Sequence, residues 1–483
     1  MNKMPEIQKY GGTWKLFEKE KLYQGELHIN YDKRVIALEI LLPASEGNPM
    51  PRPPYKGKIP YICGTLFSGA KILLYDCSTG REHNRLMSYT QQIIYANYVF
   101  WGLDVSSEEE IKFTKAIFDF GEIIEWSGLC NYKWELADDG GSNLMWFHQD
   151  PVKFELSKNL EITFFPNQGS IGGDMYGKEI MANQHISIEF AYKNPTAWDS
   201  IMEDALCIQY LIGLGVNQKV EIYKAQYCHS SIYIEFPKDD GISKKMHRPA
   251  DMIMGTGKIE PTRNTRRYDC LYTLDDIKGN DAFIKWRENY SMIKPVLDLY
   301  FTVFSNAAGT PEMLFLNLTQ ALETYHSRLI TDDAKAYSDR VDDLVESFCQ
   351  GNSNTEQWKN FLLDEGQKRN TKSIYLRSRL ADLVFANGIL PFWPNGCLPD
   401  DYLRKIVDTR NYYTHYNPAK LEKAFEKEEL PWVNGHLIAL LEYHLLVLMG
   451  FDTDEVRKKT VEKIRRIDDA YQIQEHTHDI ESR

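Results

Sequence analysis

Residue types that can cleave a phosphodiester lie together in one short segment, residues 408–416. The segment contains Arg410, Asn411 and His415. A histidine can transfer a proton near neutral pH, and an arginine can bind a phosphate through two parallel hydrogen bonds and neutralise charge that grows during a reaction. An asparagine can orient the imidazole or a phosphate oxygen. These side chains therefore suit cleavage of a phosphodiester without a metal ion or a cofactor.

The segment closes a helix that we expect to begin near Pro399. A residue that precedes a proline is disfavoured in the α region of backbone conformation. The pair Asn417-Pro418 should therefore end the helix near Tyr416. This end leaves His415 in the last helical turn, where an active-site histidine is accessible.

Helical spacing determines which of the three side chains can act together. At about 100° per residue, Asn411 and His415 share one face, whereas Arg410 lies roughly 140° around the helix from His415. Arg410 and His415 can therefore meet only at an edge of the helix or across a subunit boundary. A two-fold axis beside the helix would bring two copies of the segment together. The spacing thus predicts a composite site in a homodimer, or in a dimer of dimers.

An Arg-x4-His spacing is weak by itself, because a chain with 12 histidines can contain one such match by chance. The alternative is a helix-end histidine that caps carbonyls and an arginine in a surface ion pair. The surrounding sequence favours a functional site. The segment TRNYYTHY (residues 409–416), with the upstream helix LFLNLTQALETYHSRLI (residues 314–330), resembles the Arg-x4-6-His signature of HEPN domains. It also looks like the HEPN domain of the ApeA group of anti-phage proteins.

This resemblance covers roughly residues 311–471 and implies a metal-independent endoribonuclease that acts at a dimer interface. Arg410 and His415 would be its catalytic residues, with Asn411 in the polar position after the arginine. The ribose 2′-hydroxyl would be the nucleophile, which restricts the substrate to RNA and gives a 2′,3′-cyclic phosphate and a 5′-hydroxyl end. Some HEPN toxins carry a modified tyrosine two residues after the histidine, but Asn417 stands there in this chain. The neighbouring side chains expected to bind substrate are Arg404, Tyr412 and Tyr416.

The resemblance also implies a biological setting: abortive-infection defence against phage, with tRNA as the target. The β-rich region would then sense a phage-derived protein or restrain the nuclease. The competing hypothesis is a non-catalytic HEPN scaffold that dimerises and whose β region binds a protein or a carbohydrate. The presence of both Arg410 and His415 favours the enzyme, because an inactive bundle would be free to lose them.

Length and composition predict a folded protein of two to three domains, with 483 residues of which 43% are hydrophobic and 26% charged. The net charge of −13 argues against a surface that coats nucleic acid, so any RNA contact must be local. No apolar run approaches 20 residues and no leader is apparent, so we expect a cytoplasmic protein without a membrane segment. The eight cysteines contain no CxxC pair and are expected as buried thiols. HEXXH, P-loop, dinucleotide-binding and GxSxG motifs are absent from the sequence.

The order of strand-like and helical segments predicts an α+β multidomain chain, with an antiparallel β-rich N-terminal region followed by a helical HEPN bundle. Residues 1–150 form a first β-rich domain. Residues 151–280 form a second, with one helical insert at 196–215 that ends at a glycine, and with basic linker loops at 238–280. Residues 281–483 form the helical domain, with a lead-in helix and a basic C-terminal helix. The strands suit either a pair of sandwiches or one large sandwich.

Two local features and several further side chains complete the expectations. Residues 122–136 continue the strand pattern, and Pro295 breaks the lead-in helix. His436 and His444 are expected in a core or an interface, whereas Glu323 and His326 either line the active-site cleft or form an exposed polar pair.

Four larger groups of side chains, one aromatic and three basic, have two interpretations each. The tryptophans of the first region form either a binding face or a core, and the basic residues form either RNA contacts or solvated surface. The tryptophans are Trp14, Trp101, Trp126 and Trp134. The basic groups are Lys244, Lys245, His247 and Arg248; Arg263, Arg266 and Arg267; and Arg457, Lys458, Lys459, Lys463, Arg465 and Arg466.

Overall fold

A computed structural model shows two compact units, residues 1–276 and 277–483. It describes residues 7–481 except for residues 18–20, 45–50, 54, 86–87, 122, 137–139, 174–179, 237–243, 256–264, 305–308, 331–374 and 386–397. Several expectations fall outside the described residues. They are two helices that the sequence predicts in the helical domain, near 338–348 and 355–366, and the residues Arg263, Cys349 and Cys397.

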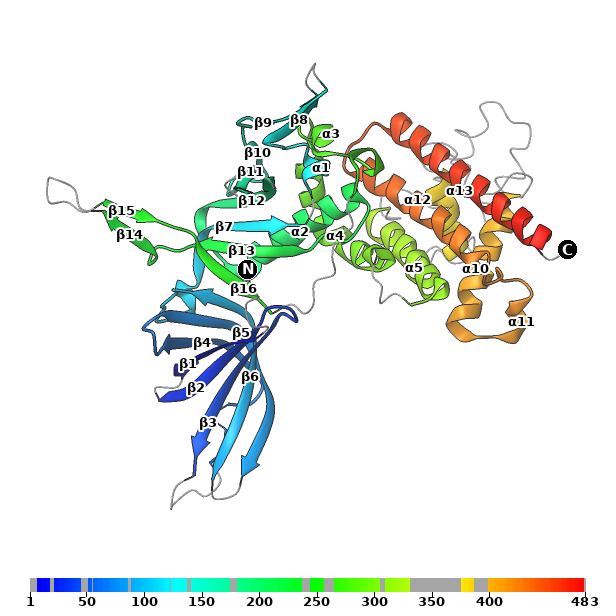
Figure 1. Ribbon diagram of the computed structural model, residues 1–483. Coiled ribbons are helices and arrows are strands. Elements are labelled where there is room, and N and C mark those ends of the chain that lie inside the picture. The colour runs from blue at the N-terminus through cyan, green and yellow to red at the C-terminus, as the bar shows by residue number, and fades with distance from the viewer. Residues whose placement is uncertain are drawn as a thin grey trace. The chain divides into compact units, whose positions relative to one another are not determined.

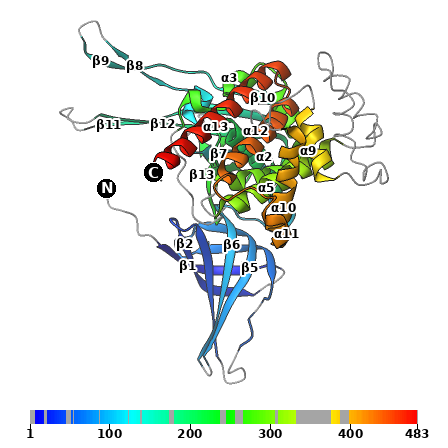
Figure 2. The same cartoon turned by 90° about the vertical axis from the view of Figure 1, so that its right-hand side faces the viewer.

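Six antiparallel strands form a closed barrel in the first unit (Figures 1 and 2). They pair in the order β6-β3-β2-β1-β4-β5, and β5 pairs with β6 to close the ring. Alternate side chains point inward and form one apolar core, because successive residues of a strand face opposite sides. The barrel strands are β1 (Ile7–Leu16), β2 (Leu22–Asn30), β3 (Val35–Pro43), β4 (Lys58–Leu66), β5 (Lys71–Arg85) and β6 (Tyr89–Trp101).

Strand β6 also belongs to a second sheet. One of its edges pairs with β3 over residues 89–95 and then with β16 over residues 98–100. From β16 the sheet continues through β13, β7, β12, β11 and β10, so strands from before and after residue 150 share one sheet. Their bounds are β7 (Lys112–Phe120), β10 (Val152–Glu155), β11 (Leu160–Gly173), β12 (Ile180–Ala197), β13 (Ile222–Cys228) and β16 (Ala250–Met254).

The expected sandwich arrangement is wrong, because the closed pairing of β5 with β6 encloses the core within a single curved sheet. The expected linker loops also contain regular structure. Residues 250–254 alternate between exposed and buried side chains and pair with strands on both sides, which makes them β16. The other described elements there are β15 (Lys244–His247), which forms a hairpin with β14 (Tyr233–Phe236), the 3-10 helix η2 (Arg267–Asp269) and α3 (Leu274–Ile277). A further hairpin joins β8 (Tyr132–Leu136) and β9 (Ser142–Trp146).

The expected helical insert is α2 (Trp198–Val216), and it covers part of the second sheet. The fully buried Trp198 meets Phe100 and Phe113 edge to face, with ring centroids 5.0 and 5.5 Å away. The helix ends at Asn217, whose φ of 55° is left-handed, and not at the expected glycine. An asparagine tolerates this conformation better than most residues, so it can serve as a helix stop.

Two of the four tryptophans assigned above to a core or a binding face pack in the core. Trp14 and Trp126 are fully buried, Trp101 is partly exposed, and the side chain of Trp134 lies outside what the structure describes. Trp126 belongs to a one-turn helix, α1 (Ile124–Ser127), where a strand was expected. This helix ends after one turn because Gly128 adopts a left-handed φ of 67°.

The expectation that the cysteines are buried thiols holds for only some of those that the structure describes. Cys77 and Cys207 are buried thiols, as expected. Four others are partly exposed: Cys63, Cys130, Cys228 and Cys270.

The second unit is a helical bundle around α12, which has buried residues on nearly every side. Pro295 does not break the lead-in helix, because Ile293, Val296 and Leu297 stay buried in one continuous helix. The helices are α4 (Ala282–Tyr300), α5 (Pro311–Leu329), α9 (Leu376–Phe385), α10 (Pro399–His415), α11 (Pro418–Leu421), α12 (Leu430–Leu448) and α13 (Thr453–Glu481). Among the described helices none is long and apolar enough to cross a membrane.

The barrel core predicts different tolerance at two glycines. A Cβ at Gly64 would lie 2.3 Å from the ring of Trp14, which is fully buried and cannot move aside. A Cβ at Gly11 would lie 2.7 Å from the ring of Phe67, which is 75% exposed and can rotate away. We expect Gly64→Ala to lower the free energy of unfolding by about 1–3 kcal/mol and Gly11→Ala to cost clearly less. Urea denaturation followed by tryptophan fluorescence measures both, and equal losses would contradict the packing argument.

Candidate active site

Helix α10 has the bounds that the sequence predicts. It runs from Pro399 to His415, and Tyr416 ends it with a left-handed backbone at φ 49° and ψ 39°. The N–H of Tyr416 donates to the carbonyl of Tyr412 at 2.5 Å. Asn417 is extended and its side chain accepts from the N–H of Ala419 at the start of α11. His415 therefore lies in the last helical turn, and its side chain is exposed.

The opposite face of α10 fixes the helix in the bundle. The Tyr402 hydroxyl hydrogen-bonds to Nδ1 of the buried His436 at 2.8 Å. Oγ1 of the fully buried Thr409 accepts from the N–H of Phe425 at 2.8 Å and donates to the carbonyl of Lys405 at 2.7 Å. This anchoring holds the exposed end of the helix in a fixed orientation, which a catalytic group requires.

The guanidinium of Arg410 is held by two acceptors. Nη1 donates to Oδ1 of Asn411 at 3.3 Å, and Nη2 lies 3.6 Å from Oε2 of Glu323 on α5. Both charged side chains of this pair are about one-third exposed, so the pair is accessible to solvent. Glu323 therefore lies at the candidate site. His326, one turn further along α5, does not, because it is fully buried.

Within one chain, the side chains of Arg410 and His415 do not interact. Among the described residues no hydrogen bond, ion pair or ring contact connects the two side chains, as the 140° separation predicts. Beside His415 lies a cluster of three rings, with centroids 5.0 Å apart for Tyr412–Tyr413 and 5.8 Å for Tyr412–Tyr416. Tyr413 was missing from the sequence candidates, although the run YYTHY could have indicated it. Burial raises the pKa of its phenol.

Arg404 lies two turns before the motif. Its Nη2 pairs with Oδ2 of Asp400 at 2.7 Å within the same helix, and its side chain is 56% exposed. Exposed pairs of this kind contribute little stability, so the guanidinium can exchange Asp400 for another anion.

Comparison with known families identifies the chain. The protein-family model described as "ApeA N-terminal domain 1" matches residues 9–286, and the family model described as "Apea-like HEPN" matches residues 316–455. The chain belongs to the ApeA family. No curated protein and no solved structure gives a significant match. The family and the fold class expected from the sequence, an antiparallel β region followed by a helical HEPN domain, are thereby confirmed.

The candidate site lies on α5 and α10, in the part of the chain that matches the ApeA-like HEPN domain. HEPN domains are generally ribonucleases, and the ApeA type is associated with abortive-infection defence. The roles of the individual residues Arg410, Asn411, His415, Arg404, Tyr412 and Tyr416 stay predictions.

Buried polar side chains connect the helices beneath the ApeA site. Nε2 of His326 lies 2.7 Å from Oδ2 of Asp382, and its Nδ1 lies 3.0 Å from Nη1 of Arg379. His444 on α12 hydrogen-bonds through Nε2 to the carbonyl of Leu383 at 3.0 Å. His326, His436 and His444 are thus core residues that join α5, α9, α10 and α12.

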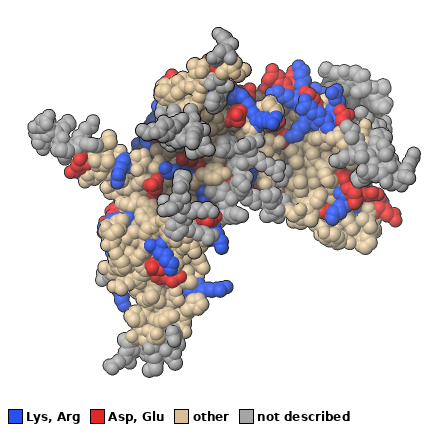
Figure 3. Space-filling view, in the orientation of Figure 1, with Lys and Arg blue, Asp and Glu red and all other residues tan. Residues whose placement is uncertain are grey.

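The basic C-terminal helix has side chains in ion pairs and others at the surface, and RNA contact by this helix stays a prediction. Lys463 pairs with the buried Glu442 at 2.5 Å, and Arg466 pairs with Glu462 on the same helix. Lysine and arginine side chains nevertheless gather over the first half of α13, interspersed with acidic ones (Figure 3). A shallow depression there is lined by Asp454, Arg457, Lys458, Val461, Glu462 and Arg465.

Burial of His444 predicts a pH dependence of stability. Desolvation lowers its pKa from 6.5 to about 4 in the folded state. As the pH falls below 6.5, the unfolded chain takes up a proton at this residue that the folded chain does not, so stability is lost between about pH 6.5 and pH 4. We expect a loss of about 2 kcal/mol from this residue between about pH 7 and pH 5.

The measurement compares free energies of unfolding at the two pH values. His444→Gln keeps a donor for the Leu383 carbonyl but does not titrate, so it should flatten the pH dependence by that amount. His148→Gln is the control, because this side chain is 73% exposed. An unchanged slope in His444→Gln would show that His444 is not buried as a neutral base.

Proposed function

We propose that this protein is a metal-independent HEPN endoribonuclease that cleaves RNA, with tRNA as its substrate. The observation that carries the proposal is the end of α10, where an exposed His415 follows an Arg410 that Glu323 and Asn411 hold in place. These groups supply proton transfer and charge neutralisation, which are the two requirements of phosphodiester cleavage by a neighbouring hydroxyl.

The proposed reaction is an internal transfer at phosphorus. His415 removes the proton of the ribose 2′-hydroxyl while the 2′-oxygen forms a bond to phosphorus. The bond from phosphorus to the 5′-oxygen breaks, and that oxygen takes a proton from an imidazolium. The products are a 2′,3′-cyclic phosphate and a 5′-hydroxyl. Arg410 stabilises the additional negative charge on the phosphoryl oxygens, for which a guanidinium is well suited.

A second copy of the chain would complete this site. Arg410 and His415 point in different directions on one helix, so a homodimer, or a dimer of dimers, across the exposed end of α10 would place one chain's arginine beside the other's histidine. Two histidines would then be present, one as the base and one as the acid. This assembly is part of the proposal.

Substrate binding would use the surfaces around α10. The rings of Tyr412, Tyr413 and Tyr416 can stack on unpaired bases, which suits a tRNA loop. Arg404 can contact a phosphate, and the basic positions of α13 extend the contact. Because the whole chain has a net charge of −13, recognition of RNA has to be confined to these local groups.

The first catalytic prediction concerns single substitutions. His415→Ala and Arg410→Ala should each reduce cleavage of purified tRNA by at least about a hundred-fold, because each removes one of the two chemical functions. His415→Ala should change the free energy of unfolding by no more than about 0.5 kcal/mol, since its side chain is exposed. His148→Ala is the control, and Arg410→Lys should retain part of the activity.

The same cleavage assay tests whether the reaction needs a metal ion and whether the site is shared between two subunits. Activity should survive EDTA, and end-group analysis should find the cyclic phosphate. A mixture of inactive Arg410→Ala and inactive His415→Ala chains should regain partial activity if the two residues act from different subunits. Cleavage by His415→Ala at the wild-type rate would overturn the assignment, and a fully active monomer would overturn the composite site.

The β unit is proposed as the sensor and regulator of an abortive-infection system in the cytoplasm, with a phage-derived protein as the trigger. The size of this unit supports the proposal, because residues 1–276 far exceed what an RNase needs to grip its substrate. A restraint that shifts an equilibrium a hundred-fold needs only about 3 kcal/mol.

Expression of residues 277–483 alone tests the regulatory role. We expect this fragment to be more toxic to uninfected cells than the full chain, with its His415→Ala variant as the control. If the fragment folds and dimerises but is no more toxic, the β unit does not inhibit the nuclease. A substrate-binding role for that unit would then be the better hypothesis.

A further inference from the structure

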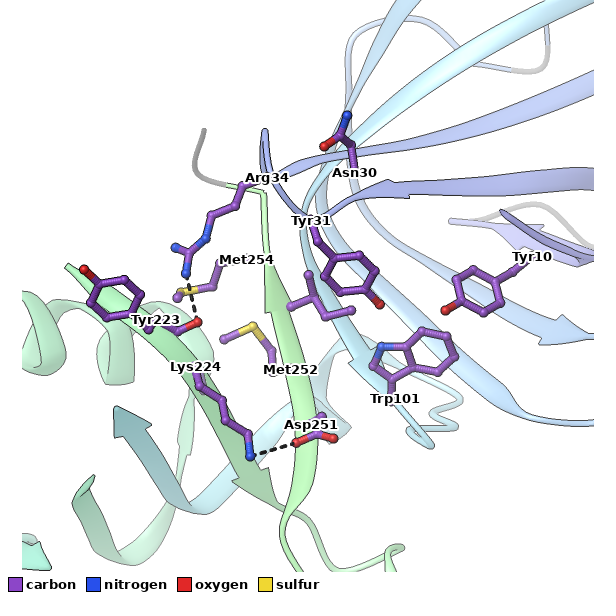
Figure 4. Close-up of a pocket in the computed structure, with 12 residues that line it drawn as sticks. Tyr10, Asn30, Tyr31, Arg34, Trp101, Tyr223, Lys224, Asp251, Met252 and Met254 are labelled. Carbon is purple, nitrogen blue, oxygen red and sulfur yellow. Dashed lines mark hydrogen bonds and ion pairs between the residues drawn. The ribbon is translucent and has the colours of Figure 1, made fainter. Parts of the chain in front are cut away.

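A cavity of about 500 Å³ lies in the first unit, where the barrel meets the second sheet (Figure 4). The turn between β2 and β3 and the end of β6 form one side, and β13 and β16 form the other. Its floor contains the buried side chains of Met252 and Met254. The volume is within the range of sites that bind small molecules.

Aromatic side chains form the barrel side of the cavity. Tyr10, Tyr31 and Trp101 lie together there, as Figure 4 shows. The rings of Tyr10 and Trp101 meet edge to face at 5.1 Å, and Tyr31 is 41% exposed. Burial and a hydrogen bond with the Tyr10 hydroxyl raise the pKa of Tyr31, so its phenol stays neutral. This wall offers ring faces to a planar ligand.

Two cationic side chains lie on the opposite side, toward β13 (Figure 4). Nη2 of Arg34 donates to the carbonyls of Ile222 and Tyr223 at 2.7 and 2.9 Å, which fixes the guanidinium at the wall. Arg34 also has a φ of 47°, a left-handed conformation that costs a non-glycine residue about 1–2 kcal/mol. Such conformations persist where the surrounding structure determines them, and they are frequent at binding sites.

Lys224 is the more accessible cation. Its Nζ lies 3.9 Å from Oδ1 of Asp251, and both side chains are more than half exposed. A pair of this length and exposure is weak, so the ammonium can turn toward a bound anion. The lining carries two cations and one carboxylate, which disfavours a cationic ligand, although Glu221 outside the lining also acts electrostatically on Arg34. Asp251 and Asn30 add hydrogen-bonding groups at the rim.

We propose that this cavity binds a nucleotide, whose base lies against the aromatic wall and whose phosphate contacts Lys224 and Arg34. Ring faces opposite fixed positive charge match the two ends of a nucleotide, and base stacking on aromatic side chains tolerates any base. The nucleotide is either a free mononucleotide or a residue of single-stranded RNA. The cavity belongs to the first unit and α10 to the second, so the proposal stands whether or not the helical unit cleaves RNA.

Calorimetric titration of the full-length His415→Ala protein tests this inference, because that variant should leave RNA probes intact. The probes are the four nucleoside 5′-monophosphates, adenosine, inorganic phosphate and a short single-stranded RNA. We expect at least one nucleotide or the RNA to bind, and adenosine and phosphate alone to bind at least about ten-fold more weakly. Binding of mononucleotides identifies a free nucleotide as the ligand, whereas binding of the RNA alone identifies a strand.

Matched variants locate the binding. Tyr31→Ala and Lys224→Gln should each weaken it about ten-fold. The controls are Tyr233→Ala, a tyrosine of similar exposure on β14, and Lys153→Gln, a lysine in the cross-strand pair with Glu161. The controls should bind as the parent does. Absence of binding at millimolar concentration, equal affinity for adenosine, or unchanged affinity in both cavity variants would overturn the proposal.

Discussion

The hydrogen bonding of β6 is the constraint on which the first unit depends. A strand has two edges, and β6 uses one for β5 along its length and divides the other between β3 and β16. The first pairings close the barrel, and the last one joins the barrel to the second sheet. Where the partner of β6 changes from β3 to β16, the N–H of Gly255 donates to the carbonyl of Asn97 at 2.7 Å. A Cβ at Gly255 would lie 2.6 Å from the carbonyl oxygen of Ala96, so only glycine fits here.

The same junction creates the cavity beside the barrel. A closed barrel presents few unpaired edges, and its interior is filled by side chains. The second sheet continues from the barrel through β6, and residues of the β2–β3 turn and of β13 line the cavity between the two parts. Arg34 crosses this space to the carbonyls of β13 and ties the two parts together. Polar and aromatic side chains can therefore face solvent in a hollow that neither part would form alone.

In the helical unit, buried polar contacts perform a comparable role for the candidate site. Glu442 on the central helix accepts from the Tyr300 hydroxyl at 2.9 Å and from Lys463 at 2.5 Å, which connects α4, α12 and α13. His436 connects α10 to α12 and, through Asp468, to α13. Buried polar groups are costly unless they are satisfied, so these contacts favour one arrangement of the helices. These contacts thereby determine the position of the exposed end of α10.

The sequence by itself determined the features that depend on local chemistry. Pro399 and Asn417-Pro418 defined α10, the alternation of side chains defined most strands, and the motif with its aromatic neighbours indicated the family that the comparisons confirm. These features follow from steric preferences and periodicities that act within a few residues.

Only the tertiary structure decided how distant segments pair. The pairing of β1 with β4 in the barrel, the strand β16 in an expected loop, the buried contact of His326 with Asp382 and the contact of Glu323 with Arg410 all join residues far apart in the chain. Pro295 shows the same limit, because packing keeps the helix continuous through the proline. Local patterns specify which face of an element is apolar, but the partner that covers that face is chosen by packing of the whole unit.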